Sequence, residues 1–262
     1  MAESRNQCHD ILPEHDNYEV TGLTRSVVCV VIPTLNESGT IGVLIESLEK
    51  LRDFYQIRII IVDDGSTDGT IETVRESSKK YGNLTLIERD RKLGLGNAIR
   101  TGIRAALDLE PILDFIVTMD ADLSHDPNEL PKLVEACEQD FMVVGSRYVK
   151  GGEIHGWGLY RKTISKGANI LARALTGISI KDCSSGFRCY SADLMRDLLP
   201  GLKSIGYDIQ IEILSKAARH GFKMTEKPIT FRNRASGESK LRYGDMLNFV
   251  KRVFILFRET SE

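Results

Sequence analysis

The feature that most constrains the fold is the alternation of short apolar runs with stretches of helical periodicity. The runs are rich in β-branched residues, which is typical of buried strands, and lie at residues 26–33, 57–62, 84–88, 115–119 and 141–145. Apolar side chains recur at helical spacing between them, at residues 40–51, 70–81, 95–109 and 128–138. This order predicts an α/β fold with a mainly parallel sheet and helices on both faces.

The second half of the chain is less regular. Glycines at 151, 152, 156 and 158 interrupt the pattern, and helices are expected at 160–175 and 207–220, with a strand at 222–231. We expect a flexible leader over 1–24, one folded domain over 25–240 and a C-terminal amphipathic helix within 241–262.

Composition excludes several classes of protein. A net charge of -2 and a pI near 6.3 give no reason to expect a nucleic-acid partner. The five cysteines contain no C-x-x-C pair, so neither a disulfide framework nor a zinc site is indicated, and reduced thiols in a cytosolic setting are expected. No signal peptide is expected, and no apolar run reaches the roughly 18 residues of a membrane span.

Two carboxylates follow the fourth predicted strand directly. Asp120 and Asp122 flank Ala121, and Ser124 lies two residues further on. Carboxylates at this spacing can share a hard divalent cation that neutralises a diphosphate, and Ser124 could add an oxygen ligand. A solvated loop with helix-capping aspartates is the alternative interpretation.

A second polar group follows the first two strands. Asp64 comes after residues 57–62, and the segment Pro33-Thr34-Leu35-Asn36-Glu37 ends the neighbouring strand. An aspartate there can accept hydrogen bonds from a nucleotide base, although turn chemistry also explains the sequence. The glycines of Lys92–Ala98 could favour phosphate at a helix N-terminus, but a tight entry into the helix explains them better.

Basic residues outside the sheet are candidates for binding phosphate. Arg147 follows the fifth strand, Arg161 and Ser165 are one helical turn apart, and Arg234 and Lys240 share a loop. Guanidinium groups bind phosphate oxygens bidentately. A solvated basic face is the alternative for each residue taken singly.

Taken together, these passages resemble the family 2 glycosyltransferases of GT-A fold, and within them the dolichol-phosphate mannose synthases. The resemblance extends from residue 27 to about 257. The matching passages occur in family order, at residues 33–37, 60–70, 92–96, 119–125, 145–148, 206–212 and 237–240.

The resemblance implies an inverting transfer of mannose from GDP-mannose to dolichyl phosphate. It places the guanine and ribose among Pro33, Leu35, Glu37, Val62 and Asp64, although Leu35 departs from the tyrosine often found there. It implies that Asp120, Ala121 and Asp122 meet the diphosphate and Mg2+ or Mn2+.

The same resemblance assigns Arg147, Arg234 and Lys240 to phosphate. We expect Arg147 on the donor side, and Arg161, Ser165, Arg234 and Lys240 at the acceptor phosphate. Asp122 and Arg147 are the expected catalytic residues, and residues 182–188 are expected to shape the acceptor side. A phosphate monoester has a second pKa of about 6, so its oxygen is anionic at neutral pH and needs little help from a base.

Other functions stay open at this point. Transfer of glucose from UDP-glucose to a polyprenyl phosphate would use the same fold, and a non-catalytic subunit that binds sugar nucleotides would keep the pocket without turnover. Donor competition and turnover assays separate these alternatives.

A lipid acceptor implies peripheral contact with a membrane. The segment 245–259 has one apolar side and could lie in the interface, or pack on the sheet or on a small membrane-anchoring subunit. The basic helix 160–175 is a second candidate. We expect the protein on the cytoplasmic face of a membrane, the endoplasmic reticulum in a eukaryote or the plasma membrane in a prokaryote.

Overall fold

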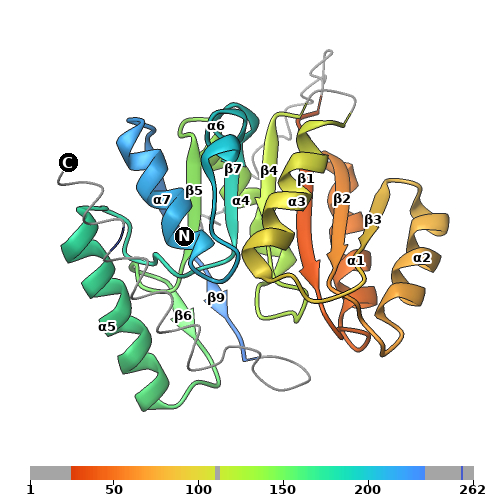
Figure 1. The fold of residues 1–262 in the computed structure, drawn as a ribbon, viewed down its shortest axis with the longest axis horizontal. Coiled ribbons are helices and arrows are strands. Elements are labelled where there is room, and N and C mark those ends of the chain that lie inside the picture. The colour runs from red at the N-terminus through yellow and green to blue at the C-terminus, as the bar shows by residue number, and fades with distance from the viewer. Residues whose placement is uncertain (1–24, 110–112, 234–254, 256–262) are drawn as a thin grey trace, which may run out of the picture.

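A computed structural model describes residues 25–109, 113–233 and Ile255 (Figure 1). The expected leader, Arg234, Lys240 and the C-terminal amphipathic helix lie outside the described residues. No helix among the described residues is long and apolar enough to cross a membrane.

The centre of the fold is a seven-stranded sheet in the order β3-β2-β1-β4-β7-β5-β8. Only β7 runs antiparallel to its neighbours in this sheet, and β6 and β9 form a separate parallel pair. The strands are β1 (Val27–Thr34), β2 (Gln56–Asp63), β3 (Leu84–Glu88), β4 (Phe115–Thr118), β5 (Met142–Ser146), β6 (Glu153–Ile154), β7 (Arg188–Ser191), β8 (Met224–Pro228) and β9 (Thr230–Phe231).

Helices cover both faces of the main sheet (Figure 1). The α-helices are α1 (Ile41–Glu49), α2 (Thr70–Tyr81), α3 (Leu95–Leu107), α4 (Leu130–Cys137), α5 (Leu159–Thr176), α6 (Ala192–Leu198) and α7 (Ile209–Arg219). Short 3-10 turns lie at Lys50–Asp53, Pro127–Glu129 and Leu199–Gly201. The predicted α/β architecture is confirmed.

Two apolar layers explain why the central strands read as continuous apolar runs. In β1, Val28 and Val30 face α1, α2 and α4, whereas Cys29 and Val31 face α3, α6 and α7. Successive side chains of a strand point to opposite faces, so a strand covered on both sides needs apolar residues throughout. The four described cysteines are free and buried.

Two parts of the sequence reading are wrong. The antiparallel β7 and α6 were not expected, because Arg188-Cys189-Tyr190-Ser191 begins with a charged residue and is short. The strand expected at 222–231 is two strands, because Ile229 changes partners: its N–H donates to Ser146 and its carbonyl accepts from Glu153. β8 therefore joins the main sheet and β9 joins β6.

Gly102 of α3 provides a test of this packing. A Cβ atom there would collide with a Cγ atom of Val31 and lie 3.2 Å from one of Val62. We expect Gly102→Ala to lower the free energy of unfolding by about 1–3 kcal/mol, because the rigid core must shift. Urea denaturation measures this change.

Gly167 of α5 is the matched control, because a Cβ atom there would meet nothing within 4 Å. Gly167→Ala should raise the free energy of unfolding by about 0.5–1 kcal/mol through the lower entropy of the unfolded chain. Equal effects of the two substitutions would refute the close approach of α3 to β1.

Candidate functional site

The predicted site residues follow strands that end at one edge of the sheet. Thr34 at the end of β1 pairs with Asp63 at the end of β2, and β4 lies on the other side of β1. Ligands of parallel sheets bind beyond this carboxyl edge. The loops after β1, β2 and β4 therefore meet there.

The two adjacent aspartates after β2 have different tasks. The Asp63 carboxylate is fully buried and accepts hydrogen bonds from the Thr34 hydroxyl at 2.7 Å, the Ser66 N–H at 2.7 Å and the Gly65 N–H at 3.1 Å. It holds the turn. Asp64 instead lines the cavity described below.

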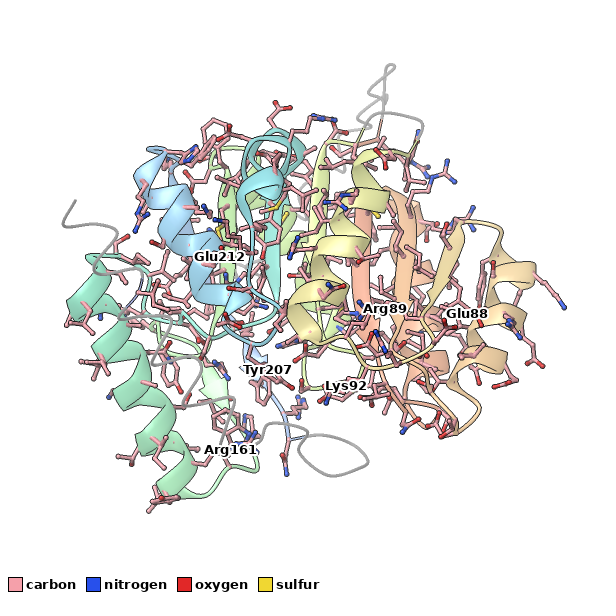
Figure 2. All side chains as sticks on the ribbon, viewed as in Figure 1. Glu88, Arg89, Lys92, Arg161, Tyr207 and Glu212 are labelled. Carbon is pink, nitrogen blue, oxygen red and sulfur yellow. The ribbon has the colours of Figure 1, made fainter. Side chains whose placement is uncertain are left out.

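Asp64 is held by an arginine that sequence reasoning missed. Arg89, which follows β3, forms an ion pair with one Asp64 oxygen, and the other oxygen accepts a hydrogen bond from the Gly94 N–H at 3.2 Å. The Arg89 guanidinium also donates to Asn97 at 2.7 Å. Arg89 lies beside β3 and the start of α3 (Figure 2), so it orients Asp64 from behind.

The loops after β1 and β2 are joined by hydrogen bonds. Asn36 adopts a left-handed conformation with φ 53°, and its side chain accepts from the Thr67 N–H at 2.9 Å. Its own N–H donates to the Ser66 hydroxyl at 2.8 Å, and the Glu37 N–H donates to the Thr70 hydroxyl at 2.8 Å. These contacts fix the wall that carries Leu35 and Glu37.

A cavity of about 150 Å³ lies where these loops meet. Its lining is Pro33, Thr34, Leu35, Glu37, Asp64, Lys92, Gly94, Leu95, Ala98, Asp120, Ala121, Asp122, Gly206 and Tyr207. The structure thus gathers the predicted donor-side residues with two exceptions. Val62 is buried beneath them with its side chain toward Gly102, and Arg147 does not line this cavity.

The glycines of the Lys92–Gly96 turn are explained by close packing. A Cβ atom on Gly96 would lie 2.7 Å from the Ser204 carbonyl oxygen and 2.8 Å from that of Gly206, and the Gly96 N–H donates to Ile205 at 2.9 Å. The start of α3 therefore abuts the loop before α7. This contact places Lys92 and Tyr207, both labelled in Figure 2, on the cavity wall.

The turn after β4 presents Asp120 and Asp122. The Asp122 carboxylate accepts a hydrogen bond from the Ser124 N–H at 3.0 Å, and Leu123 between them has a φ of 59°. A leucine in this region costs about 1–2 kcal/mol, so the turn is held by its surroundings.

These residues fit a hard divalent cation. Both carboxylates line the cavity, and the Ser124 hydroxyl is buried without a hydrogen-bond partner. Oxygen ligands suit Mg2+ and Mn2+. No group of three or more His, Cys, Asp or Glu residues that could hold a metal occurs in the described part of the chain. A cation here would need further oxygens from the nucleotide diphosphate.

His125 stabilises this turn through a hydrogen bond to its backbone. Its Nδ1 accepts a hydrogen bond from the Asp120 N–H at 3.2 Å, so a proton on the neutral ring sits on Nε2. The ring stacks on Phe187 at 5.2 Å and meets Phe231 edge-on at 5.5 Å. Burial lowers the pKa of His125 to about 4, against the opposing attraction of Asp122.

Arg147 forms a buried bidentate ion pair with Asp182. Its Nε and Nη2 lie 2.7 Å from the two carboxylate oxygens, and Nη2 also donates to the Ser184 hydroxyl at 2.8 Å. Burial would lower the pKa of Arg147 and raise that of Asp182, but their mutual attraction and hydrogen bonds reverse both shifts. Both groups stay charged, and Arg147 has a fixed orientation.

Trp157 joins Arg147 to the predicted acceptor residues. The guanidinium of Arg147 lies 5.4 Å from the Trp157 ring and that of Arg161 lies 4.1 Å from it. The Tyr148 hydroxyl donates to Ser165 at 2.7 Å. Arg147, Arg161 and Ser165 therefore belong to one cluster. Sequence reasoning missed Trp157, although it is the chain's only tryptophan and could have pointed to this cluster.

Residues 182–188 shape this region, although Arg188 itself is structural. Asp182 orients Arg147, and a Cβ atom on Gly186 would lie 3.3 Å from an Asp120 carboxylate oxygen. Arg188 is fully buried and donates to the carbonyls of Cys183, Ser185 and Gln210. The turn thus touches both the carboxylates and the arginine cluster.

Residues 29–199 match the model of glycosyl transferase family 2. The chain therefore belongs to this family and is a glycosyltransferase.

Two relatives match most of the chain. The undecaprenyl-phosphate mannosyltransferase of Micrococcus luteus is 37% identical over 83% of this chain and 88% of its own length. The dolichol-phosphate mannosyltransferase of Pyrococcus furiosus is 38% identical over 90% of this chain, which spans 65% of that relative.

Solved structures confirm the GT-A-like fold. Glucosyl-3-phosphoglycerate synthase from Mycobacterium tuberculosis, in complex with phosphoglyceric acid, has a TM-score of 0.67 at 22% identity, over 89% of this chain and 80% of its own. Its complex with Mn2+, UDP and glucosyl-3-phosphoglycerate has a TM-score of 0.66 at 24% identity, with the same coverage. At these identities the likeness shows the fold alone.

The low pKa of His125 predicts a specific acid sensitivity. The histidine takes up a proton near pH 6.5 in the unfolded chain but only near pH 4 in the folded one. The unfolded state therefore binds more protons between these values, and stability must fall as the pH drops from about 6.5 to 4. His125→Asn should make this fall smaller, as measured by urea denaturation at a series of pH values. An unchanged pH dependence in the variant would contradict the buried neutral ring.

Proposed function

We propose that this glycosyltransferase transfers mannose from GDP-mannose to a polyprenyl phosphate, such as dolichyl phosphate, with inversion at the anomeric carbon. The observation that carries the proposal is the adjacency of two oppositely charged regions. Asp120 at the cavity lies beside Gly186, which belongs to the same turn as Asp182, the partner of Arg147. Arg147 and Arg161 in turn both lie against the Trp157 ring. The names of the two relatives, both mannosyltransferases that use a polyprenyl phosphate, support the choice of sugar and acceptor class.

The donor side rests on Asp64 and Glu37. Guanine carries ring and amino N–H donors, and the Asp64 carboxylate is an acceptor held in place by Arg89. Glu37 and Leu35 line the same cavity, where the ribose would lie. Lys92 adds a positive charge to a cavity wall otherwise rich in carboxylates.

Asp120 and Asp122, with Ser124 nearby, would hold Mg2+ or Mn2+. When bound, the cation would neutralise the charge that develops on the departing GDP. The carboxylates need not act as bases.

The acceptor phosphate would lie against Arg147, Arg161 and Ser165, and we keep Arg234 and Lys240 as proposed partners on the same side. An anionic phosphate oxygen forms the new bond to C1 of mannose while the bond from C1 to the diphosphate oxygen breaks and its electrons leave with GDP. Alignment of an already ionised nucleophile is what the arginines supply. His125 is buried and its Nδ1 accepts from the Asp120 N–H, so it supports the turn and is no general base.

The cellular setting is part of the same proposal. A lipid acceptor and a sugar nucleotide meet at the cytoplasmic face of a membrane, where small anchoring subunits would assist. The chain spans only 65% of the length of the Pyrococcus relative. The proposed membrane setting is therefore argued from the chemistry of the lipid acceptor.

Donor competition tests the function. Purified protein with a polyprenyl phosphate in detergent should form a lipid-linked sugar from radiolabelled GDP-mannose, and unlabelled UDP-glucose should not compete. Transfer from UDP-glucose alone would overturn the choice of donor. Binding of GDP-mannose without turnover would favour the non-catalytic alternative.

The role of the carboxylates predicts the effect of Asp122→Asn. An asparagine can still accept the Ser124 hydrogen bond, so the fold should be retained while kcat falls by about 100-fold or more. Asp126→Asn is the matched control: Asp126 caps the next turn through Asn128, and asparagine is an equally good cap. Full activity of Asp122→Asn, or wild-type turnover in excess chelator, would refute the metal role.

A further inference from the structure

Gln210 is a buried residue whose side-chain amide has no hydrogen-bond partner in the described part of the chain. The residue is only 3% exposed, and its Oε1 atom is buried and unpartnered. Its Nε2 atom donates to no described residue either. A buried amide without partners destabilises a folded chain, so such a group calls for an explanation, for example a ligand that completes its hydrogen bonds.

Other buried amides of the chain differ from Gln210. The side chains of Asn83 and Asn169 also bury an unpartnered oxygen, but the nitrogen of each donates two hydrogen bonds. Those two amides therefore join parts of the fold to one another. The Gln210 amide makes no such connection.

The backbone of Gln210 is nevertheless firmly held. Its carbonyl accepts from Nη1 of the buried Arg188 at 2.7 Å, and its N–H donates to the Tyr207 carbonyl at 3.3 Å. It is the second residue of α7, and Tyr207, labelled in Figure 2, lines the cavity just before this helix. The amide is therefore carried by a fixed backbone close to the cavity wall.

The Gln210 side chain lies beside one of the cavity carboxylates. A Cβ atom on Gly186 would lie 3.3 Å from an Asp120 carboxylate oxygen and 3.7 Å from Gln210 Nε2. The two polar atoms thus border one space, which the missing side chain of Gly186 leaves open. Gly186 is not among the glycines with positive φ, so its backbone does not require a glycine.

The proposed reaction places the sugar in this region. Its C1 atom must lie between the diphosphate, held through Asp120, and the acceptor phosphate at Arg147. One turn connects the two places, because Asp182 pairs with Arg147 and Gly186 lies beside Asp120. Gln210 lies at the Gly186 end of this turn.

We propose that the Gln210 amide binds a hydroxyl group of the sugar in the nucleotide-sugar donor and thereby contributes to the choice of sugar. An amide offers a donor and an acceptor without a charge, which suits a hydroxyl, whereas phosphates are better met by guanidinium groups and cations. This inference deepens the proposed function and rests on it, because it takes the donor to be a nucleotide sugar.

The stability of Gln210→Met separates a ligand contact from a structural one. Methionine has a similar length and volume but no amide. The melting temperature should stay the same or rise, because the substitution removes an unpartnered buried group. A fall of about 5 °C or more would show that the amide has a partner within the fold, and would contradict the proposal.

Donors that lack single hydroxyl groups identify the contact. We suggest measuring kcat/KM for GDP-mannose and for analogues deoxygenated in turn at C2, C3, C4 and C6. Gln210→Met should lower kcat/KM for GDP-mannose by about tenfold. At one position the wild type should lose a similar factor on the deoxygenated analogue, whereas the variant should use that analogue as well as GDP-mannose. Independent losses at all four positions would contradict the contact.

Gln56→Met is the matched control. Gln56 is exposed and begins β2, which ends at Asp63, so it lies at the sheet edge opposite the cavity. The substitution should leave kcat/KM unchanged for every donor. Equal effects of the two glutamine substitutions would refute a specific role of Gln210.

Binding measurements separate this contact from the proposed function. Calorimetry in the presence of Mn2+ should show that Gln210→Met weakens the binding of GDP-mannose by about tenfold and leaves that of GDP unchanged. If the wild type binds GDP-mannose through Gln210 without turnover, the proposed transfer fails and the contact stands. If the wild type transfers mannose but Gln210→Met changes neither affinity nor discrimination, a water completes the amide, and the contact is wrong while the transfer reaction stands.

Discussion

The rest of the site depends on the hydrogen bonds that the buried guanidinium of Arg188 donates to three backbone carbonyls. Its hydrogen bonds to the carbonyls of Cys183, Ser185 and Gln210 fix the turn before β7 against the start of α7. A buried charge without such partners would be very costly, so this turn has little freedom. Three residues of this turn contact the site. Asp182 bonds Arg147, Gly186 lies beside Asp120, and the Phe187 ring stacks on His125.

Both halves of the site are therefore set by buried ion pairs. Arg89 orients Asp64 from behind, and Asp182 orients Arg147 in the same way. Preorientation matters because a charged group that is already fixed loses little entropy when it binds its ligand. The resulting arrangement combines the carboxylates of Asp64, Asp120 and Asp122 at the cavity with the guanidinium groups of Arg147 and Arg161 at Trp157.

Most of the sheet and the positions of the cavity carboxylates could be predicted from the sequence, for identifiable physical reasons. The strands β1, β2 and β4 are buried on both faces and so read as apolar runs, and the turns after them hold Asp64, Asp120 and Asp122 at the cavity. The sequence could not show the pairs Arg89–Asp64 and Arg147–Asp182, since their members lie far apart in the chain.

The central claim is that Asp120 and Asp122 hold a cation that binds the diphosphate of a nucleotide whose base lies at Asp64. Anomalous diffraction from crystals grown with Mn2+ and GDP tests it most directly. The account predicts a manganese peak within bonding distance of the Asp122 carboxylate and of the diphosphate, with guanine in the cavity lined by Leu35 and Asp64. A nucleotide bound outside this cavity, or manganese bound away from both aspartates, would contradict it.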